Sequence, residues 1–126
     1  MPIKILLLED SEAWLDLYRR YLDLADVEVT IFSSPSIAGA KEIIAANPDM
    51  RIVVVDGNVV DGKIDDTCAF VRELRNEGFA GHMIAASADI SWRLSLVDAG
   101  CNRNYEGEGK LGMRIVFQQV LKLVDK

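Results

Sequence analysis

Short apolar runs alternate with longer amphipathic stretches along this chain. Ile5 to Leu8 and Ile52 to Val55 are apolar at every position, which is typical of strands buried on both faces of a parallel sheet. Five runs in all have the length and composition of strands. Their predicted ranges are Ile3–Leu8, Val27–Phe32, Ile52–Val55, His82–Ala86 and Cys101–Tyr105.

The stretches between these runs show the spacing of amphipathic helices. Ser11, Ser36 and Ser91 are predicted to cap the first, second and fourth helices, and Gly78 suits the end of the third. The predicted apolar stripe of the first helix comprises Trp14, Leu17, Tyr18, Tyr21, Leu22 and Ala25. The second helix is predicted to end near Asn47 and the fourth at Ala99. The third is predicted to run from Asp65 to Glu77, and the last from about Met113 to Val124.

Five β–α units in alternation predict one fold class. Strands separated by helices pair in parallel through right-handed crossovers. We therefore expect an α/β fold: a doubly wound, five-stranded parallel sheet of order 2-1-3-4-5, flanked by five helices and flavodoxin-like. The 126 residues are predicted to form a single domain, 1–126, with no output domain attached.

Composition narrows the class of partner. The net charge of −6 disfavours binding of nucleic acid or of an anionic membrane surface. No signal peptide or apolar run of membrane-spanning length is present in the sequence, so a cytoplasmic location is expected. Cys68 and Cys101 lie in apolar surroundings without metal-site spacing and are interpreted as core residues.

Polar residues follow three of the predicted strands. Glu9 and Asp10 follow the first strand, Asp56 the third and Ser87 the fourth. Because the carboxyl ends of parallel strands share one edge of a sheet, three carboxylates are expected to converge there. Carboxylates that repel one another would be relieved by a hard cation, and Mg²⁺ matches this ligand set. A carboxylate beside such a metal can accept a phosphoryl group, with the Ser87 hydroxyl donating to a phosphoryl oxygen.

An acidic group precedes the third helix. Asp61, Asp65 and Asp66 are interpreted as caps of that helix, and a contribution to the metal site is the alternative.

These features resemble the receiver domains of two-component response regulators, over nearly the whole chain. The similar segments are Ile5-Leu6-Leu7-Leu8-Glu9-Asp10-Ser11, Ile52-Val53-Val54-Val55-Asp56, Met83-Ile84-Ala85-Ala86-Ser87-Ala88 and Asp98-Ala99-Gly100-Cys101. The resemblance implies that Glu9 and Asp10 bind Mg²⁺ and that Asp56 accepts phosphate from a histidine kinase. It also implies that Asn58 offers its backbone carbonyl to the metal and that Ser87 contacts the phosphate.

The resemblance fails at the end of the fifth strand, where receivers carry Lys-Pro. One alignment places Gly107 and Glu108 there, with Asn104 at a position that is usually aromatic. A one-residue slip restores an aromatic, Tyr105, but puts Glu108 at the lysine position. Lys110, just beyond, is our hypothetical substitute cation.

Two further positions are interpreted through the same resemblance. Asn58 and Asp89 lie two residues past Asp56 and Ser87, where receivers tune the loss of phosphate. Polar residues there resemble chemotaxis-type, fast-cycling receivers.

The sequence thus predicts a single-domain receiver that is phosphorylated on Asp56 in a Mg²⁺-dependent manner. It would catalyse only its own phosphoryl transfer and dephosphorylation. Expected partners are a sensor histidine kinase or phosphotransfer protein and a downstream protein target. A homodimer through the face of the fourth helix, fifth strand and last helix is a further expectation.

Three other functions are weighed against this one. The altered fifth strand favours a pseudo-receiver, with the same fold used for docking or dimerisation without phosphate. An Asp-nucleophile phosphatase usually has a second Asp where this chain has Asn58. A flavodoxin-like cofactor binder would need a Gly-rich phosphate loop in place of Glu9-Asp10.

Overall fold

The computed structural model describes residues 2–56, 59–87, 89–104, 118 and 120–124. The strands are β1 (Ile3–Leu8), β2 (Val29–Ser34), β3 (Ile52–Val55), β4 (His82–Ala85) and β5 (Arg103–Asn104). The helices are α1 (Glu12–Leu24), α2 (Ile37–Ala46), α3 (Ile64–Asn76) and α4 (Ile90–Ala99). Residues 118 and 120–124 are also helical and belong to the predicted last helix.

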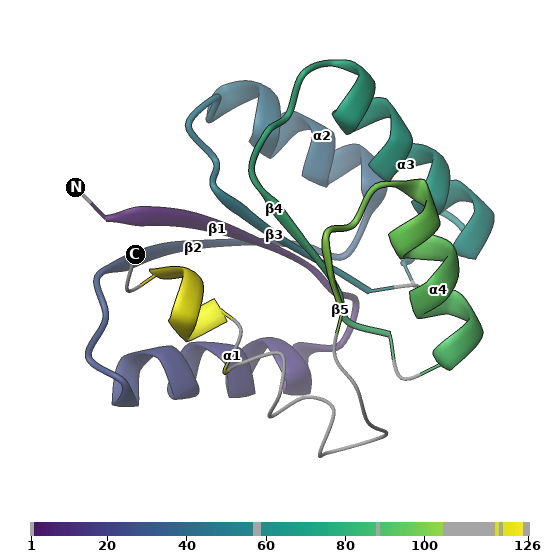
Figure 1. The fold of residues 1–126 in the computed structure, drawn as a ribbon. Helices are drawn as coiled ribbons and strands as arrows, with labels where there is room; N and C mark the ends of the chain where they lie inside the picture. The colour runs from purple at the N-terminus through teal and green to yellow at the C-terminus, as the bar shows by residue number, and fades with distance from the viewer. Residues whose placement is uncertain (1, 57–58, 88, 105–117, 119, 125–126) are drawn as a thin grey trace.

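The five strands form one parallel sheet in the order β2-β1-β3-β4-β5 (Figure 1). Leu8 pairs with Val55, and Val55 pairs with Ala85, so β1, β3 and β4 end side by side. The predicted fold class and strand order are confirmed. This register brings the residues that follow these three strands to the same edge of the sheet.

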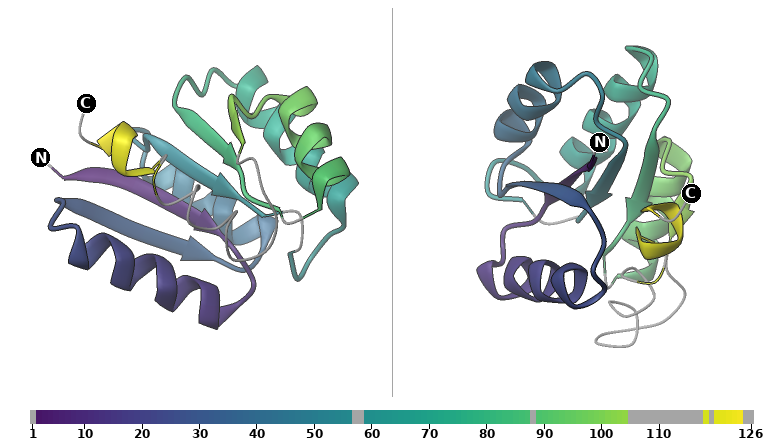
Figure 2. Two further views of the ribbon diagram at one scale, coloured as in Figure 1. Left: turned by 60° about the horizontal axis from the view of Figure 1, so that its bottom comes forward. Right: turned by 90° about the vertical axis from the view of Figure 1, so that its left-hand side faces the viewer.

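Helices cover both faces of the sheet (Figures 1 and 2). Alternate residues of β1 and β3 belong to different cores, because successive side chains of a strand point to opposite faces. Leu6, Leu8, Val53 and Val55 pack with residues of α2, α3 and α4. Ile5, Leu7, Ile52 and Val54 pack with residues of α1 and with Val120 and Leu123 near the C-terminus. In the described part of the chain, no helix combines the length and apolar character needed to span a bilayer.

Some predicted boundaries and faces were wrong. β2 runs two residues later than predicted at both ends, because Ser33 and Ser34 continue the pairing with Leu7 and Leu8. β4 ends one residue early, at Ala85, and β5 begins at Arg103, two residues later than predicted. The first helix buries Leu15, Tyr18 and Leu22, whereas Leu17 of the predicted stripe is 45% exposed.

Helix caps account for two further corrections. Ser11 and Ser36 cap α1 and α2 as predicted. Helix α4, however, is capped by Asp89, whose carboxylate accepts from the backbone N–H groups of Ser91 and Trp92. Asp61 was assigned to the third helix, but its carboxylate accepts from the N–H groups of Ile37 and Ala38 at the start of α2. Asp66 does serve α3, since it accepts from the Lys63 N–H.

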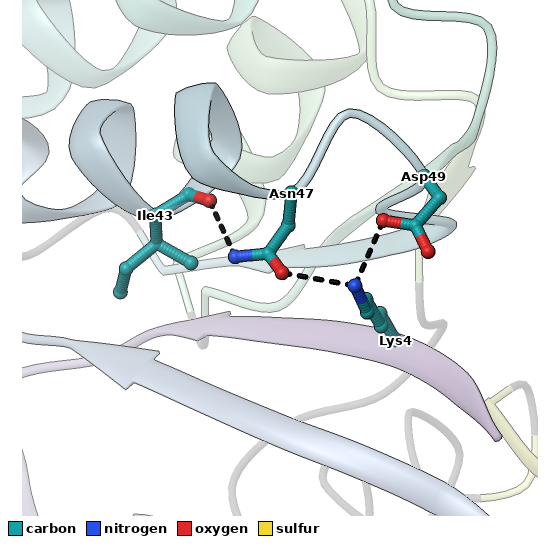
Figure 3. A network of polar contacts seen from close by, with 4 residues as sticks. All are labelled: Lys4, Ile43, Asn47 and Asp49. Atoms are coloured by element: carbon teal, nitrogen blue, oxygen red, sulfur yellow. Dashed lines mark hydrogen bonds and ion pairs between the residues drawn. The ribbon is translucent and has the colours of Figure 1, made fainter.

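A polar network fixes the connection from α2 to β3 against β1 (Figure 3). The Lys4 ammonium donates to Asn47 Oδ1 at 3.0 Å and to Asp49 Oδ1 at 2.9 Å. The Asn47 amide in turn donates to the carbonyl oxygen of Ile43, in the last turn of α2. The network therefore satisfies a helix-end carbonyl and secures the chain that leads into β3, the strand that presents Asp56.

Cys68 and Cys101 are buried and form no disulfide, which confirms their placement in the core. Burial raises the pKa of the Cys101 thiol to about 12, so this thiol stays protonated at neutral pH.

Candidate phosphoryl and metal site

Three carboxylates meet at the carboxyl edge of the sheet. The Asp56 N–H donates to the Leu8 carbonyl oxygen at 3.1 Å, and the Glu9 N–H donates to the Ser34 carbonyl oxygen at 3.0 Å. These bonds continue the sheet pairing just past the strands and set Asp56 beside the turn of Glu9 and Asp10. One carboxylate oxygen of each residue lies within 4.8 Å of those of the other two. The structure thus brings these three residues together, and their chemical roles stay predictions.

The electrostatics of this cluster are unfavourable without a cation. Glu9 is 6% exposed, and its pKa is raised to about 8, first by burial and then by the charge of Asp56. One bond opposes this effect: the Ser11 N–H donates to Glu9 Oε1 at 3.1 Å and favours the charged form. The cluster therefore keeps a proton on Glu9 at neutral pH unless positive charge arrives.

The ligand atoms suit a small, hard cation. Mg²⁺ binds oxygen at 2.0–2.1 Å in an octahedron, so opposite ligand oxygens lie about 4.2 Å apart. Adjacent ligand oxygens lie about 3 Å apart, so three carboxylate oxygens within 4.8 Å of one another need to approach by only about 1–2 Å to share such an ion. Asp10 is exposed and Asp56 is half-buried, which leaves an open side for water or phosphate ligands. The donor set fits Mg²⁺, with Glu9, Asp10 and Asp56 as the residues that would hold it.

Replacing Glu9 with glutamine is expected to flatten the pH dependence of stability in metal-free protein. In the wild type, the raised pKa means that folded protein keeps a proton that unfolded protein loses above about pH 4.5. This contribution to stability is complete below that pH and falls as the pH rises to about 8, by at most about 5 kcal/mol. The free energy of urea unfolding, measured in chelator across this range, checks the prediction.

The matched control for this measurement is Glu42→Gln, on the exposed face of α2. It should retain the wild-type slope of stability against pH. If stability changed with pH equally in wild type and Glu9→Gln, the raised pKa of Glu9 would be contradicted.

Ser87 lies next to this cluster. The Ala86 N–H donates to the Val55 carbonyl oxygen at 2.9 Å, so the chain after β4 stays beside β3 up to Ser87. Ser87 is buried, and its Oγ accepts from the Asp89 N–H at 3.2 Å. Asp89 itself is exposed, and its carboxylate is engaged in capping α4. Hydrogen bonds from Ser91 and Trp92 lower the Asp89 pKa, so the cap is ionised at neutral pH.

Several predicted site residues lie outside the described residues. These are Asn58, expected to offer its carbonyl to the metal, and Lys110, the hypothetical substitute cation, together with Tyr105, Gly107 and Glu108.

One buried charge near Ser87 went unrecognised in the sequence. Arg93 on α4 is 4% exposed, and its Nη1 donates to the Ser87 carbonyl oxygen at 3.1 Å. An arginine in an amphipathic stretch is usually assigned to the solvent face. One signal accompanies this burial: Ile90, Leu94 and Val97 of α4 are apolar but exposed, so apolar character does not mark the buried face of this helix.

Comparison with known proteins gives matches at the level of structure. The signal receiver domain of a putative LuxO repressor protein from Vibrio parahaemolyticus has a TM-score of 0.78 at 18% identity, covering 99% of this chain and 92% of that one. A response regulator from Thermotoga maritima has a TM-score of 0.76 at 15% identity, with both chains fully covered. The BeF3-activated receiver domain of DrrB, also from Thermotoga maritima, has a TM-score of 0.74 at 14% identity, again over both full chains. No protein-family model and no curated protein sequence matches this chain.

These solved structures share one architecture with this chain across its whole length at sequence identities below 20%. Sheet order, helix placement and the acidic edge agree with the resemblance found in the sequence. The chain has the fold of a response-regulator receiver domain, with an acidic cluster of Glu9, Asp10 and Asp56 at the carboxyl edge of its sheet.

Proposed function

We propose that this protein is a phosphorylation-dependent signalling module that accepts phosphate on Asp56 with Mg²⁺ as cofactor. The observation that carries the proposal is the convergence of Glu9, Asp10 and Asp56 within 4.8 Å at the edge of a receiver fold. A cation bound by these carboxylates would supply positive charge for the transferred phosphoryl group.

The proposed reaction moves one phosphoryl group. A carboxylate oxygen of Asp56 attacks the phosphorus of a phosphohistidine on a histidine kinase or phosphotransfer protein. The new O–P bond forms as the P–N bond breaks, and the imidazole leaves and takes up a proton. The product is an acyl phosphate, which water later hydrolyses back to the Asp56 carboxylate and inorganic phosphate. We propose that Ser87 donates a hydrogen bond to a phosphoryl oxygen and that Asn58 and Asp89 tune the hydrolysis.

The output is proposed to be a contact with another protein. Ile90, Leu94 and Val97 of α4 are 58%, 63% and 38% exposed and lie at helical spacing. An apolar row of this kind on a receiver fold supports binding of a downstream target, or of a second copy through the face of α4, β5 and the last helix. We further propose that residues 1–126 act as one cytoplasmic receiver unit.

Acetyl phosphate tests the proposal without knowledge of the kinase. Wild-type protein incubated with acetyl phosphate and Mg²⁺ should gain the mass of one phosphoryl group, and the gain should be lost with excess chelator. Light scattering on the same samples tests whether phosphorylation changes the oligomeric state. Absence of any mass gain in the presence of Mg²⁺ would count against Asp56 as a phosphoryl acceptor.

A pseudo-receiver is the second candidate, favoured by Gly107 and Glu108 at the positions of the usual Lys-Pro pair. Such a protein would use the same fold for docking without phosphate. Beryllofluoride, which mimics a phosphoryl group, separates the two functions. The first predicts a Mg²⁺-dependent change in tryptophan fluorescence on adding beryllofluoride, and the second predicts none.

A further inference from the structure

The buried guanidinium of Arg93, on α4, contacts the chain just past the end of β4. In the described part of the chain, the buried polar and charged residues are Glu9, Ser34, Thr67, Ser87 and Arg93, and Arg93 is the cation among them. A guanidinium does not lose its proton inside a protein, so this charge is permanent. Burying it is costly unless nearby groups compensate, and a packing role alone would be filled better by an apolar side chain.

The contacts of Arg93 place this charge at the acidic edge of the sheet. Nη1 donates to the Ser87 carbonyl oxygen at 3.1 Å. Ser87 follows Ala86, whose N–H bonds to β3 at the Val55 carbonyl, one residue before Asp56. Neighbouring strands lie about 4.8 Å apart, so one strand spacing and one hydrogen bond separate the Arg93 guanidinium from the backbone of Asp56. At an effective dielectric constant of about 20, a full charge roughly 10 Å from an anion changes its affinity by on the order of tenfold.

The phosphorylated state would need such a charge. A phosphoryl group on Asp56 would bring close to two negative charges beside the carboxylates of Glu9 and Asp10. One divalent cation offsets only part of that total. The end of the fifth strand does not supply a second cation in either alignment, since Gly107 or Glu108 stands there.

Arg93 is also tied to the group that would respond to the phosphate. Ser87 is joined to α4 twice, through Arg93 at its carbonyl oxygen and through the Asp89 N–H at its Oγ. The Arg93 N–H donates to the Asp89 carbonyl oxygen in the first turn of α4. The charge, the hydroxyl and the start of the helix therefore form one connected unit, with Trp92 next to it in the chain.

We propose that Arg93 is a positioning residue that provides, from α4, the positive charge stabilising a phosphoryl group on Asp56. The inference rests on the proposed function and adds to it the residue that balances the charge of the phosphorylated state. In this proposal, the positive charge beside the phosphoryl group comes from α4, the helix that follows Ser87, and not from the end of the fifth strand. Charge on Asp56 and the position of α4 are thereby linked through Arg93, alongside the bond from the Asp89 N–H to Ser87 Oγ.

Beryllofluoride affinity measures this role, with Trp92 fluorescence as the signal. A Trp14→Phe background leaves Trp92 as the single tryptophan, because the chain contains two. In that background, Arg93→Gln removes the charge and keeps a hydrogen-bond donor, whereas Arg93→Lys keeps the charge. We expect Arg93→Gln to weaken Mg²⁺-dependent beryllofluoride binding about tenfold, and Arg93→Lys to stay within about threefold of the parent. Arg72→Gln, on the exposed face of α3, is the matched control and should bind like the parent.

The outcomes separate the inference from the function on which it rests. If the parent protein gives no beryllofluoride response, the proposed function fails. If the parent responds and Arg93→Gln binds equally well, or if Gln and Lys weaken binding equally, the role of the Arg93 charge is overturned. A measurement on wild-type protein covers the case in which a variant does not fold: the Arg93 Nε–H resonance should shift on adding Mg²⁺ and beryllofluoride, and an unmoved resonance would also overturn the inference.

Discussion

Replacing Asp56 with asparagine is expected to abolish phosphoryl labelling by acetyl phosphate completely. The reaction needs a carboxylate oxygen as nucleophile, and an amide at the same place is neither charged nor comparably nucleophilic. The substitution changes almost nothing in shape, and the backbone bond from residue 56 to the Leu8 carbonyl is retained. Intact-mass measurement after incubation with acetyl phosphate and Mg²⁺ gives the answer directly.

Stability distinguishes this loss from simple unfolding. The Asp56 charge is the second-largest cause of the raised Glu9 pKa, after burial. Asp56→Asn should therefore lower the Glu9 pKa and leave metal-free protein at least as stable as wild type at neutral pH. Asp98→Asn, an exposed aspartate on α4, is the matched control and should label normally. Labelling that survives in Asp56→Asn would place the acceptor elsewhere in the chain.

The convergence of the acidic cluster was predictable because it depends on topology rather than on side-chain detail. Ile5 to Leu8 and Ile52 to Val55 are apolar without interruption, and such runs predict strands buried on both faces. Once the strands are parallel and adjacent, the residues that follow them must meet at one edge. Glu9, Asp10 and Asp56 then lie together whatever the precise ends of the helices are.

Caps and buried charges were less predictable, because each depends on a partner that is remote in sequence or ambiguous locally. Asp61 caps α2 from the loop after β3, and only the fold brings that loop to Ile37 and Ala38. Asp89 and Ser91 are both good capping residues at the start of α4, and propensity alone does not choose between them. Arg93 is buried on a helix that is apolar on both faces, so periodicity does not reveal its direction.

Replacing Arg75 with methionine is expected to destabilise the fold by about 2–4 kcal/mol. Its guanidinium donates to three carbonyl oxygens: Nε to Gly100 at 2.9 Å, and Nη1 to Phe79 at 3.0 Å and Gly81 at 2.8 Å. Together these bonds join the end of α3, the entry to β4 and the end of α4. Methionine keeps the length of the side chain but leaves these carbonyls without their donors. Urea unfolding of the variant against wild type measures the loss.

Two comparisons show whether the geometry of the guanidinium is the cause. Arg72→Met, one turn earlier on the exposed face of α3, removes the same charge and should cost no more than a few tenths of a kcal/mol. Arg75→Lys keeps the charge, but one ammonium cannot reach the oxygens that a planar fork serves, so it should recover less than half of the loss. Equal stability of the Lys variant and wild type would show that charge alone accounts for the effect.

The Arg75 contacts also separate stability from the proposed chemistry. Gly81 precedes β4 and Gly100 follows α4, so these contacts lie at the amino edge of the sheet, whereas Asp56 and Ser87 follow the carboxyl ends of β3 and β4. Folded Arg75→Met protein should therefore still label on Asp56 with acetyl phosphate, at a temperature where its unfolded fraction is small. Loss of labelling in protein shown to be folded would mean that the two edges of β4 are coupled. In that case β4 and α4 would couple the two edges of the sheet, so phosphorylation of Asp56 should also alter the Arg75 contacts.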